Sequence, residues 1–293
     1  MIAEFKDAFK NNFYLSEEYA HFCERVTGLR LKVLSLKSTK LNILKNKNIS
    51  IHAYPSEARE YMKREGVSFL SVLPLENDKS DKPSFVEYPI LFRKEYQMAY
   101  KGFDRTFRKY SRRADKLGYK LRILRGYNNP MVDEIYALYL QHMRRVNGFI
   151  FPKYFFEEFM RLPSSLAFLI YHNKKLVAYS LCFENSDNLY SSIGGSHKDY
   201  LSKYVTYKIY NEKIKYACAR NLNLHMGIGI SGSGYNVFKQ RVGAVCFKCE
   251  RFPEENIEKV VYPITKYRWF GVLANIVSRI APRKTIFMLM PFT

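Results

Sequence analysis

The spacing of apolar residues predicts a helix from Phe103 to Leu117. Its apolar positions recur every three or four residues, which places them on one face of a helix; they are Phe103, Phe107, Tyr110, Ala114 and Leu117. Gly118 follows directly and is a typical helix stop. The opposite side of this helix carries a run of lysines and arginines that includes Arg112 and Arg113. A solvated face would explain this run, and so would a surface for phosphate.

Three apolar runs in succession predict an antiparallel meander, because short polar turns join them. The runs are SLAFLIYH, LVAYSLCFEN and LYSSIGGS, which occupy residues 165–172, 176–185 and 189–196. An amphipathic helix over residues 203–220 follows, with Tyr207, Tyr210, Ile214, Ala217 and Cys218 on its apolar face. After it we expect a strand LNLHMGIG, a glycine-rich loop, a short segment YNVFKQRVG and a last strand AVCFKCERF.

The first hundred residues show weaker patterns. The segment SEEYAHFCERVTG predicts a helix with an apolar stripe at Tyr19, Phe22 and Val26. The segment EAREYMKREG ends in Gly66, a good helix stop, and VSFLSVLPL reads as a strand. At the other end, RWFGVLANIVSRIAPRK is a basic amphipathic stretch that could pack on the preceding domain or touch a membrane surface.

The net charge of the sequence indicates which classes of binding partner to expect. The 293 residues contain 48 Lys and Arg against 27 Asp and Glu, a formal net charge of +21. This surplus favours an anionic partner such as a phosphate-rich cofactor, a nucleic acid or an anionic lipid surface, although solubility alone would also explain it. No apolar run reaches the length of a membrane span and no signal peptide pattern is visible, so we expect the cytoplasm, with the inner membrane face as a peripheral site.

The cysteines indicate neither disulfides nor metal. Five cysteines at scattered positions argue against a disulfide framework. Cys246 and Cys249 form a lone C-x-x-C without the second ligand pair that a zinc site needs. They also fall in a predicted strand, which would point them to opposite faces. We therefore expect structural cysteines, no disulfide partner and no metal.

Gly227, Gly229 and Gly232 spell the dinucleotide-binding pattern G-x-G-x-x-G. That fingerprint needs a strand, a glycine turn and then a long helix inside a parallel unit. Here the upstream strands form an antiparallel meander, and only a short helix-like piece follows the glycines. The pattern therefore does not indicate a dinucleotide site.

The order of meander, long helix, strand, short helix and final strand resembles the GNAT acyltransferase core, and more closely its FemAB-like branch. The resemblance rests on RKYSRRADKLGYKLRI, on the stretch from HKDYLSKY to GISGSGYN, and on Phe238-Lys239-x-x-x-Gly243-Ala244. It implies an α/β (α+β) fold with a mixed, mostly antiparallel sheet flanked by helices. It further implies a degenerate GNAT-like lobe over residues 1–97 and the core over 98–255. The basic amphipathic pattern then predicts a C-terminal extension over 256–293 that packs on the core.

The resemblance also implies where an acyl donor binds. A GNAT core holds the donor between two splayed strands, with its phosphates at the amides that lead into the long helix, where unpaired N–H groups favour anions. We expect this cofactor-binding loop at Gly194, Gly195, Ser196, His197, Lys198, Lys203 and Tyr204. An ordinary helix start capped by Ser202 is the alternative. The loop lacks the spaced glycines of acetyl-CoA-binding members, so acyl-CoA and aminoacyl-tRNA both stay open as donors.

The Phe238-Lys239 pair matches the Phe-Lys pair of FemAB-like proteins, where the lysine neutralises phosphate near the reacting groups. Lys239 could also stabilise a developing oxyanion, or it could be a surface lysine. We name His225 and Tyr235 as candidates for the base and the acid that amine attack requires. Phe238, Arg112 and Arg113 are the candidate substrate-binding residues.

These residues predict a transferase that moves an acyl or aminoacyl group to an amine, on a cell-envelope precursor or a small metabolite. Its partners would be the acyl donor, tRNA where that is the donor, and an anionic membrane surface or lipid-linked acceptor. The alternative is an RNA-binding protein without catalysis, supported by the net charge and by 24 tyrosines that could stack on bases.

Overall fold

The computed structural model describes residues 8–9, 11–35, 40–44, 47–48, 51–53, 55–66, 70–74, 86–146, 148, 150–252, 276 and 280. Contacts divide the chain into two compact units. The first comprises Met1–Tyr88, Asn147–Phe155 and Phe247–Thr293, and the second comprises Pro89–Val146 and Phe156–Cys246. Both units are discontinuous in sequence, whereas the predicted boundaries at residues 97 and 255 cut the chain into consecutive segments. The predicted C-terminal extension lies outside the described residues, apart from Ile276 and Ile280.

The first unit combines short strands with helices. Its described strands are β1 (Leu31–Ser35), β2 (Lys40–Leu44), β3 (Lys47–Asn48), β4 (Ile51–Ala53) and β5 (Leu70–Pro74). Its described helices are the 3-10 turn η1 (Phe13–Leu15), α2 (Glu17–Thr27) and α3 (Pro55–Glu65). Strands β1, β2 and β3 form one antiparallel sheet. Strand β5 pairs parallel with β4 and antiparallel with β13 (Val245–Phe252).

Helix α2 forms as its sequence predicts. The Ser16 hydroxyl accepts a hydrogen bond from Tyr19 N at 3.1 Å, which caps the first turn, and Gly28 ends the helix in the left-handed conformation. Tyr19, Phe22 and Val26 are buried. In addition, the Phe22 ring packs against Phe155, which belongs to the same unit. The predicted apolar stripe is therefore confirmed.

The second unit is built on a larger sheet. Its strands are β6 (Val86–Leu91), which begins in the first unit, β7 (Lys120–Arg125), β8 (Ser165–His172), β9 (Lys175–Glu184), β10 (Asn188–Ser196), β11 (Asn223–His225) and β12 (Gly229–Ile230). Its helices are α4 (Tyr96–Gly102), α5 (Arg105–Asp115), α6 (Asn129–Val146), α7 (Lys153–Met160), which also begins in the first unit, α8 (Val205–Ala219) and α9 (Gly234–Gln240). A 3-10 turn, η2 (Lys198–Tyr200), precedes α8.

The strand order from β6 is β6-β11-β10-β9-β8-β7, with β12 also beside β6. Strands β7, β8, β9 and β10 pair antiparallel, which confirms the predicted meander. Strand β11 pairs parallel with β10 and antiparallel with β6. The long helix α8 connects the two parallel neighbours, β10 and β11, as a crossover helix should. The result is the mixed, mostly antiparallel sheet that the sequence predicts.

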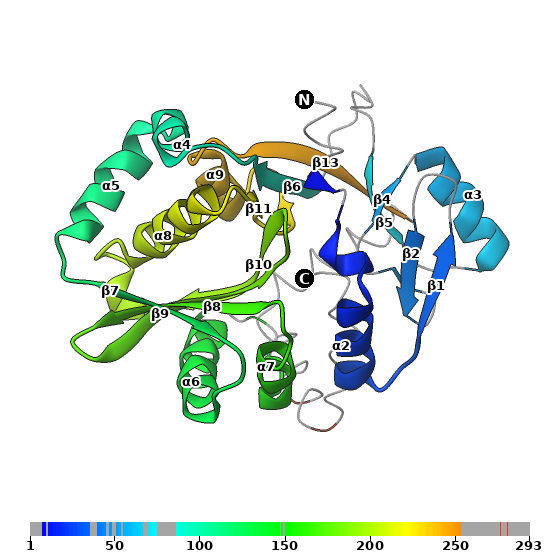
Figure 1. Ribbon diagram of the computed structural model, residues 1–293, viewed down its shortest axis with the longest axis horizontal. Coiled ribbons are helices and arrows are strands. Elements are labelled where there is room, and N and C mark those ends of the chain that lie inside the picture. The colour runs from blue at the N-terminus through cyan, green and yellow to red at the C-terminus, as the bar shows by residue number, and fades with distance from the viewer. Residues whose placement is uncertain are drawn as a thin grey trace. The chain divides into compact units, whose positions relative to one another are not determined.

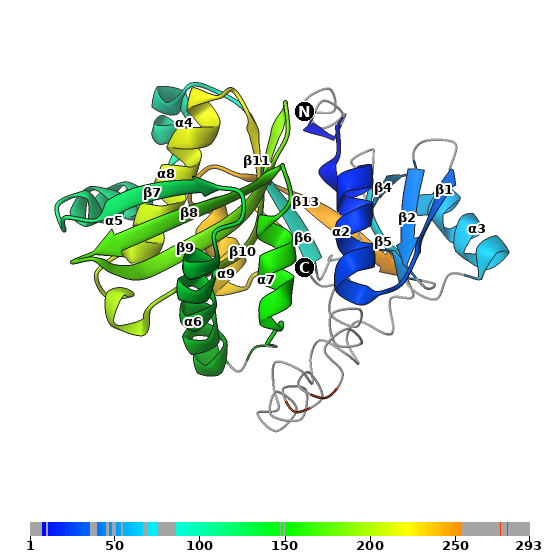
Figure 2. The ribbon, with the colours of Figure 1, turned by 60° about the horizontal axis from the view of Figure 1, so that its bottom comes forward.

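Helices cover both faces of this sheet. Helices α8 and α5 lie on one face and α6 lies on the other (Figure 1). Figure 2 shows the same sheet with α6 in front of it. The core on the α8 side includes Phe107, Leu166, Phe168 and Ile214, all fully buried. Burying one such side chain contributes about 1.5–3 kcal/mol, so the apolar face of α8 fixes this helix on the sheet.

Helix α5 begins later than predicted. The Asp104 carboxylate accepts a hydrogen bond from Phe107 N and caps α5, whose first residue is Arg105. Phe103 instead follows the end of the short helix α4, where its ring is buried against Phe107. The apolar spacing of Phe103 thus reflects packing across a chain bend rather than one continuous helix.

Within the described part of the chain, no helix combines the length and apolar character that a membrane crossing needs.

Candidate functional site

Strands β10 and β11 are paired over only three positions. The pairs are Asn188 with Asn223, Leu189 with Leu224 and Tyr190 with His225. Just beyond these pairs, Ser191 and Gly227 still lie side by side, because a Cβ at Gly227 would be 3.3 Å from Ser191 O. Beyond this point β10 continues beside β9, while β12 pairs with β6. The strand β10 and the segment that follows β11 therefore diverge after Ser191 and Gly227.

The backbone has two irregularities where the strands part. The register between β10 and β9 shifts between Ser191 and Ile193. Gly227 has a φ of +71°, a left-handed conformation that glycine adopts without strain. A bulge re-aims the side chains and carbonyls beside it. The point at which the two strands diverge is thus set by backbone geometry in both segments.

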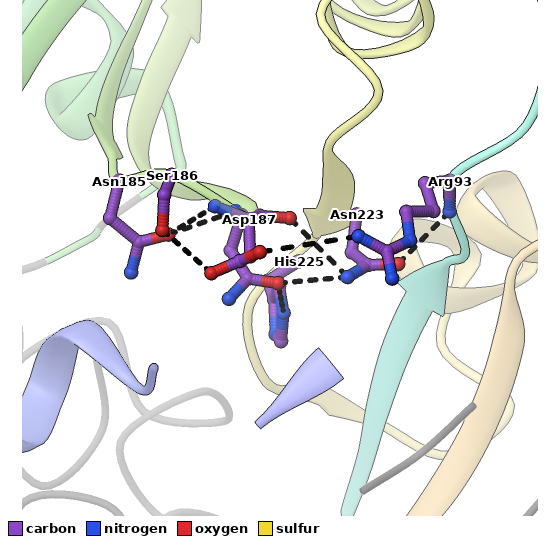
Figure 3. A network of polar contacts seen from close by, with 7 residues as sticks. Arg93, Asn185, Ser186, Asp187, Asn223 and His225 are labelled. Atoms are coloured by element: carbon purple, nitrogen blue, oxygen red, sulfur yellow. Dashed lines mark hydrogen bonds and ion pairs between the residues drawn. The ribbon is translucent and has the colours of Figure 1, made fainter. Parts of the chain in front are cut away.

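At the closed end, a network of polar side chains ties β10 to β11 (Figure 3). The Asn188 Oδ1 accepts hydrogen bonds from Asn223 Nδ2 at 3.0 Å and lies 3.1 Å from His225 Nε2. The Asn223 Oδ1 accepts a bond from Arg93 N at 3.0 Å. In the adjoining turn, Asn185 Oδ1 accepts bonds from the backbone N–H groups of Asp187 and Asn188.

This network contains the predicted base. His225 is fully buried, and its ring stacks on Tyr190 at 4.3 Å between centroids. It occupies the last paired position of β11, before the chains part. A buried imidazole held between Asn188 and Tyr190 fixes the strand pair, so its placement favours a structural role for His225.

Lys239 lies at the point where β10 and the segment after β11 diverge. It belongs to α9 and is fully buried. Its Nζ donates a hydrogen bond to Gly227 O at 2.9 Å and lies 4.2 Å from the centroid of the Tyr235 ring. The structure thus brings two of the three predicted catalytic residues, Lys239 and Tyr235, into direct contact and excludes a surface position for the lysine.

A second lysine, not predicted from the sequence, lies beside the same backbone. Lys213 projects from α8 and is only 1% exposed. Its Nζ donates hydrogen bonds to Ser191 Oγ at 2.8 Å and Ser180 Oγ at 3.2 Å. It also lies 4.1 Å from the centroid of the Tyr210 ring. The signal in the sequence was a lysine inside the apolar stripe of the long helix, between Tyr210 and Ile214.

Two tyrosines link the lysines. The Tyr210 hydroxyl donates to the Tyr235 hydroxyl at 2.9 Å. Tyr210 is buried, whereas the Tyr235 residue is 55% exposed although its hydroxyl reaches inward to Tyr210. Burial raises the pKa of both phenols, so both are neutral near pH 7. Tyr235 therefore connects the buried lysines with the surface of the second unit.

Burial also lowers the pKa of both lysines. Desolvation and then the neighbouring charge of Lys213 lower the pKa of Lys239 to about 7. Desolvation lowers the pKa of Lys213 as well. Neither amine forms an ion pair with a carboxylate among the residues that the structure describes. The cluster can therefore hold or exchange a proton near neutral pH, or neutralise an incoming negative charge.

The remaining parts of the motif are packing residues. Phe238, predicted to contact substrate, packs its ring against Phe107, Tyr207 and Tyr210. A Cβ at Gly229 would lie 2.0 Å from Asn236 Oδ1, so α9 rests directly on the backbone of β12. Helix α9 is short, as expected, and the close approach of Asn236 explains Gly229 of the G-x-G pattern.

The glycine pair of the predicted donor loop lies elsewhere. Gly194 and Gly195 belong to β10 and pair with Ser180 and Tyr179, so they are not part of a loop. A Cβ at Gly195 would be 2.9 Å from the Tyr179 ring and 3.2 Å from His142, which explains the glycine by packing against α6. Ser196 also belongs to the strand, opposite Ala178. The loop into α8 begins only at His197.

His197 is buried, and its Nε2 lies 3.0 Å from Lys175 Nζ. Its Nδ1 accepts a hydrogen bond from Asp199 N at 3.3 Å, which caps η2. Burial, followed by the charge of Lys175, lowers the pKa of His197. This side chain orders the loop, whereas Lys198 and Lys203 are exposed.

Helix α8 starts at an unusual residue. The residue at its N-cap is Tyr204, not Ser202, and its φ of +60° is left-handed with no side-chain cap. The Tyr204 ring stacks on Tyr110 of α5 at 4.6 Å, and Arg113 Nη1 donates to the Tyr204 hydroxyl at 3.2 Å. Non-glycine residues in this conformation need such support. The first N–H groups of α8 thus have no side-chain cap, and they lie next to the basic helix α5.

Helix α5 presents its cations to solvent at this end of the unit. The exposed basic residues of α5 and of its C-cap are Arg105, Lys109, Arg112, Arg113 and Lys116. Arg113 is oriented by Tyr110 and Tyr204, and Arg112 Nε lies 3.4 Å from Arg108 O. The structure therefore brings Arg113 to the start of α8 together with Tyr204. Among the described residues no cluster of metal-binding side chains is found, and all five cysteines are free thiols.

The sequence matches no family model and no curated protein. Solved structures do match. FemX superposes with a TM-score of 0.61 at 10% identity over 89% of this chain and 97% of that chain. The C-terminal domain of a putative lysylphosphatidylglycerol synthetase from Agrobacterium fabrum gives 0.56 at 11% identity over 89% and 95%. L-PGS from Bacillus licheniformis gives 0.53 at 12% identity over 92% and 98%. The fold is thus similar to that of FemX, of L-PGS and of a domain of a putative lysylphosphatidylglycerol synthetase.

Proposed function

We propose that the protein transfers an acyl or aminoacyl group from an activated ester or thioester to an amine. The observation that carries this proposal is the parting of β10 and β11 beside two buried amines. Parted parallel strands leave backbone groups that are not used in the sheet, and such groups can hold an extended donor. The similarity of fold to FemX, to L-PGS and to a domain of a putative lysylphosphatidylglycerol synthetase supports a transferase.

Each part of the site has a place in this reaction. The acceptor amine attacks the donor carbonyl, and negative charge develops on its oxygen. Lys239 lies at the point of parting, where its amine would exchange a proton with the reacting groups. The uncapped start of α8, with Arg113, Lys198 and Lys203, would hold the phosphates of the donor. Acyl-CoA and aminoacyl-tRNA both carry such phosphates, and the acceptor would be a lipid-linked or other cell-envelope precursor or a small metabolite.

The test is a transfer assay with both donor classes, acyl-CoAs and aminoacyl-tRNAs, against amines of each acceptor class, read by mass spectrometry of the product. We expect one donor class to give product. Lys239→Met should lower the rate by about 100-fold or more, the range for loss of a group that acts in the transition state. Lys215→Met is the control, because Lys215 lies on α8 but pairs with Glu212 at 3.1 Å. Absence of transfer with every donor, or an unchanged rate in Lys239→Met, would contradict the proposal.

A further inference from the structure

The described structure holds Lys213 and Lys239 on two sides of the same backbone contact. Lys213 Nζ bonds Ser191 Oγ, and Lys239 Nζ bonds Gly227 O. Ser191 and Gly227 are adjacent across the strands, as the 3.3 Å approach of a Gly227 Cβ to Ser191 O indicates. The Tyr210–Tyr235 hydrogen bond connects the two lysines along a second route. Two amines are therefore enclosed in one small, weakly polar volume.

The groups around the pair include no described carboxylate. Tyr210 of α8 faces Lys213, and Tyr235 of α9 faces Lys239. Cys182 of β9 lies next to Ser180, and Cys246 of β13 faces Lys239. Burial raises the pKa of the Cys182 thiol and of both phenols, so these three groups are neutral near pH 7. Two like charges in such a place disfavour each other strongly, so the two amines titrate as a coupled pair.

Their hydrogen bonds decide which amine keeps the proton. Lys213 has two hydroxyl acceptors, Ser180 and Ser191, and the face of Tyr210. Lys239 has one backbone carbonyl and the face of Tyr235. An ammonium donates three hydrogen bonds and a neutral amine accepts one, so Lys213 is the better site for the charge. Lys239 is then left with a lone pair at the point where the strands part.

We propose that Lys213 is a positioning residue that keeps Lys239 as a proton-exchanging amine beside the parting of β10 and β11. This inference rests on the proposed transfer reaction. As the acceptor nitrogen forms its bond to the carbonyl carbon, neutral Lys239 takes one proton from that nitrogen. As the carbon–oxygen or carbon–sulfur bond of the donor breaks, Lys239 gives this proton to the leaving oxygen or sulfur. The lysine is neutral again and no other reactant is needed.

The experiment follows the Lys239 amine directly, by NMR titration of ¹⁵N-labelled lysine side chains in the full chain, with the Lys239 signal assigned by its loss in Lys239→Met. In Lys213→Met the pKa of Lys239 should rise by about one unit or more, the size expected for loss of a close like charge. Lys213→Arg keeps the charge and should keep the pKa low. Lys215→Met removes a charge from the outer side of the same helix and should leave the Lys239 titration unchanged.

Lys213→Met should fold, because Ser180 Oγ and Ser191 Oγ lie 3.5 Å apart and can bond each other once the amine is gone. Lys213→Gln provides a second neutral variant with the same expected shift. An unchanged Lys239 titration in folded, neutral variants would overturn the inference.

The transfer rate gives an independent readout. Its rise with pH should move to higher pH in Lys213→Met by the same amount as the titration of Lys239. A shifted titration with an unmoved rate profile would overturn the proton-exchange role. A shifted titration in a protein that transfers no group would support the coupling of the two lysines and count against the proposed function.

Discussion

Lys239 is a buried base with a lowered pKa, and this has a consequence for stability. The unfolded chain holds its proton up to about pH 10.5, whereas the folded chain releases it at about 7. Between these values the unfolded state binds more protons, so stability rises with pH. Below about pH 7 both states are protonated and the full cost of burying the ammonium remains.

We therefore expect Lys239→Met to remove this dependence. From pH 7 to 9.5 the free energy of unfolding of the wild type should gain about 1 kcal/mol per pH unit relative to Lys239→Met, since one proton is worth about 1.4 kcal/mol per unit. Urea unfolding at several pH values measures it. Lys215→Met, which changes the same charge in a half-buried position, should run parallel to the wild type; a parallel Lys239→Met curve would show that the amine titrates normally.

At this scale the sequence predicted the apolar positions better than the polar ones. Tyr207, Tyr210 and Ile214 follow helical spacing, and their packing was foreseen because periodicity reports burial directly. Lys213 occupies the same face, but a lysine is expected at the surface, and its two partners, Ser180 and Ser191, come from strands far away in sequence. His225 was predicted to be a base because its residue type allows it, whereas its bond to Asn188 makes it part of the strand pair.

At the scale of elements, the position of α9 depends on one glycine. The Asn236 side chain lies against the backbone of Gly229 in β12, and α9 carries both Lys239 and Tyr235. A side chain at position 229 would overlap the Asn236 side chain, so either Asn236 must rotate or α9 must move away from the sheet. The catalytic candidates are thus placed by backbone-to-side-chain contact rather than by their own hydrogen bonds alone.

We expect Gly229→Ala to destabilise the protein by about 1–3 kcal/mol, the usual cost of overpacking, and to raise the pKa of Lys239 as α9 moves outward. Chemical unfolding and the lysine titration measure the two effects. Gly234→Ala is the matched control, because a Cβ there meets nothing within 4 Å. Equal stability of the two variants would mean that Asn236 turns aside without moving the helix.

The order of elements was largely predicted from sequence, because short polar turns between β8, β9 and β10 leave an antiparallel meander as the simple solution. The details at element ends were not. The glycine pair at 194–195 looked like a ligand loop, but its small size accommodates Tyr179 and His142. Helix α5 begins at Arg105 because Asp104 caps it. Helix α8 has Tyr204 rather than Ser202 at its N-cap, because contacts from α5 support a left-handed conformation that no local pattern reveals.

At the scale of the whole molecule, the net charge of +21 still fits an RNA-binding protein without catalysis. The feature that favours this alternative is the exposed basic side of α5. Phosphate contacts made by such a surface release counterions, so binding should weaken steeply with salt. An enzyme that takes aminoacyl-tRNA as donor would show the same dependence, and only transfer separates the two.

Arg112→Gln combined with Arg113→Gln should therefore reduce the slope of log affinity against log salt by about 1 to 2 with tRNA, measured by fluorescence anisotropy. Arg144→Gln with Arg145→Gln removes the same charge from α6, on the other face of the sheet, and should leave the slope unchanged. Equal losses in both double variants would indicate that the total charge, rather than α5, attracts the nucleic acid.

The pairing of β5 has a consequence for how the chain is made. Strand β5 ends at Pro74, while its antiparallel neighbour β13 begins at Val245, so about 170 residues separate the two partners. During synthesis from the N-terminus, the early segment emerges from the ribosome long before the strand that completes its sheet. One edge of β5 stays open to other chains throughout that interval, and the first unit can complete this sheet only after β13 has been synthesised.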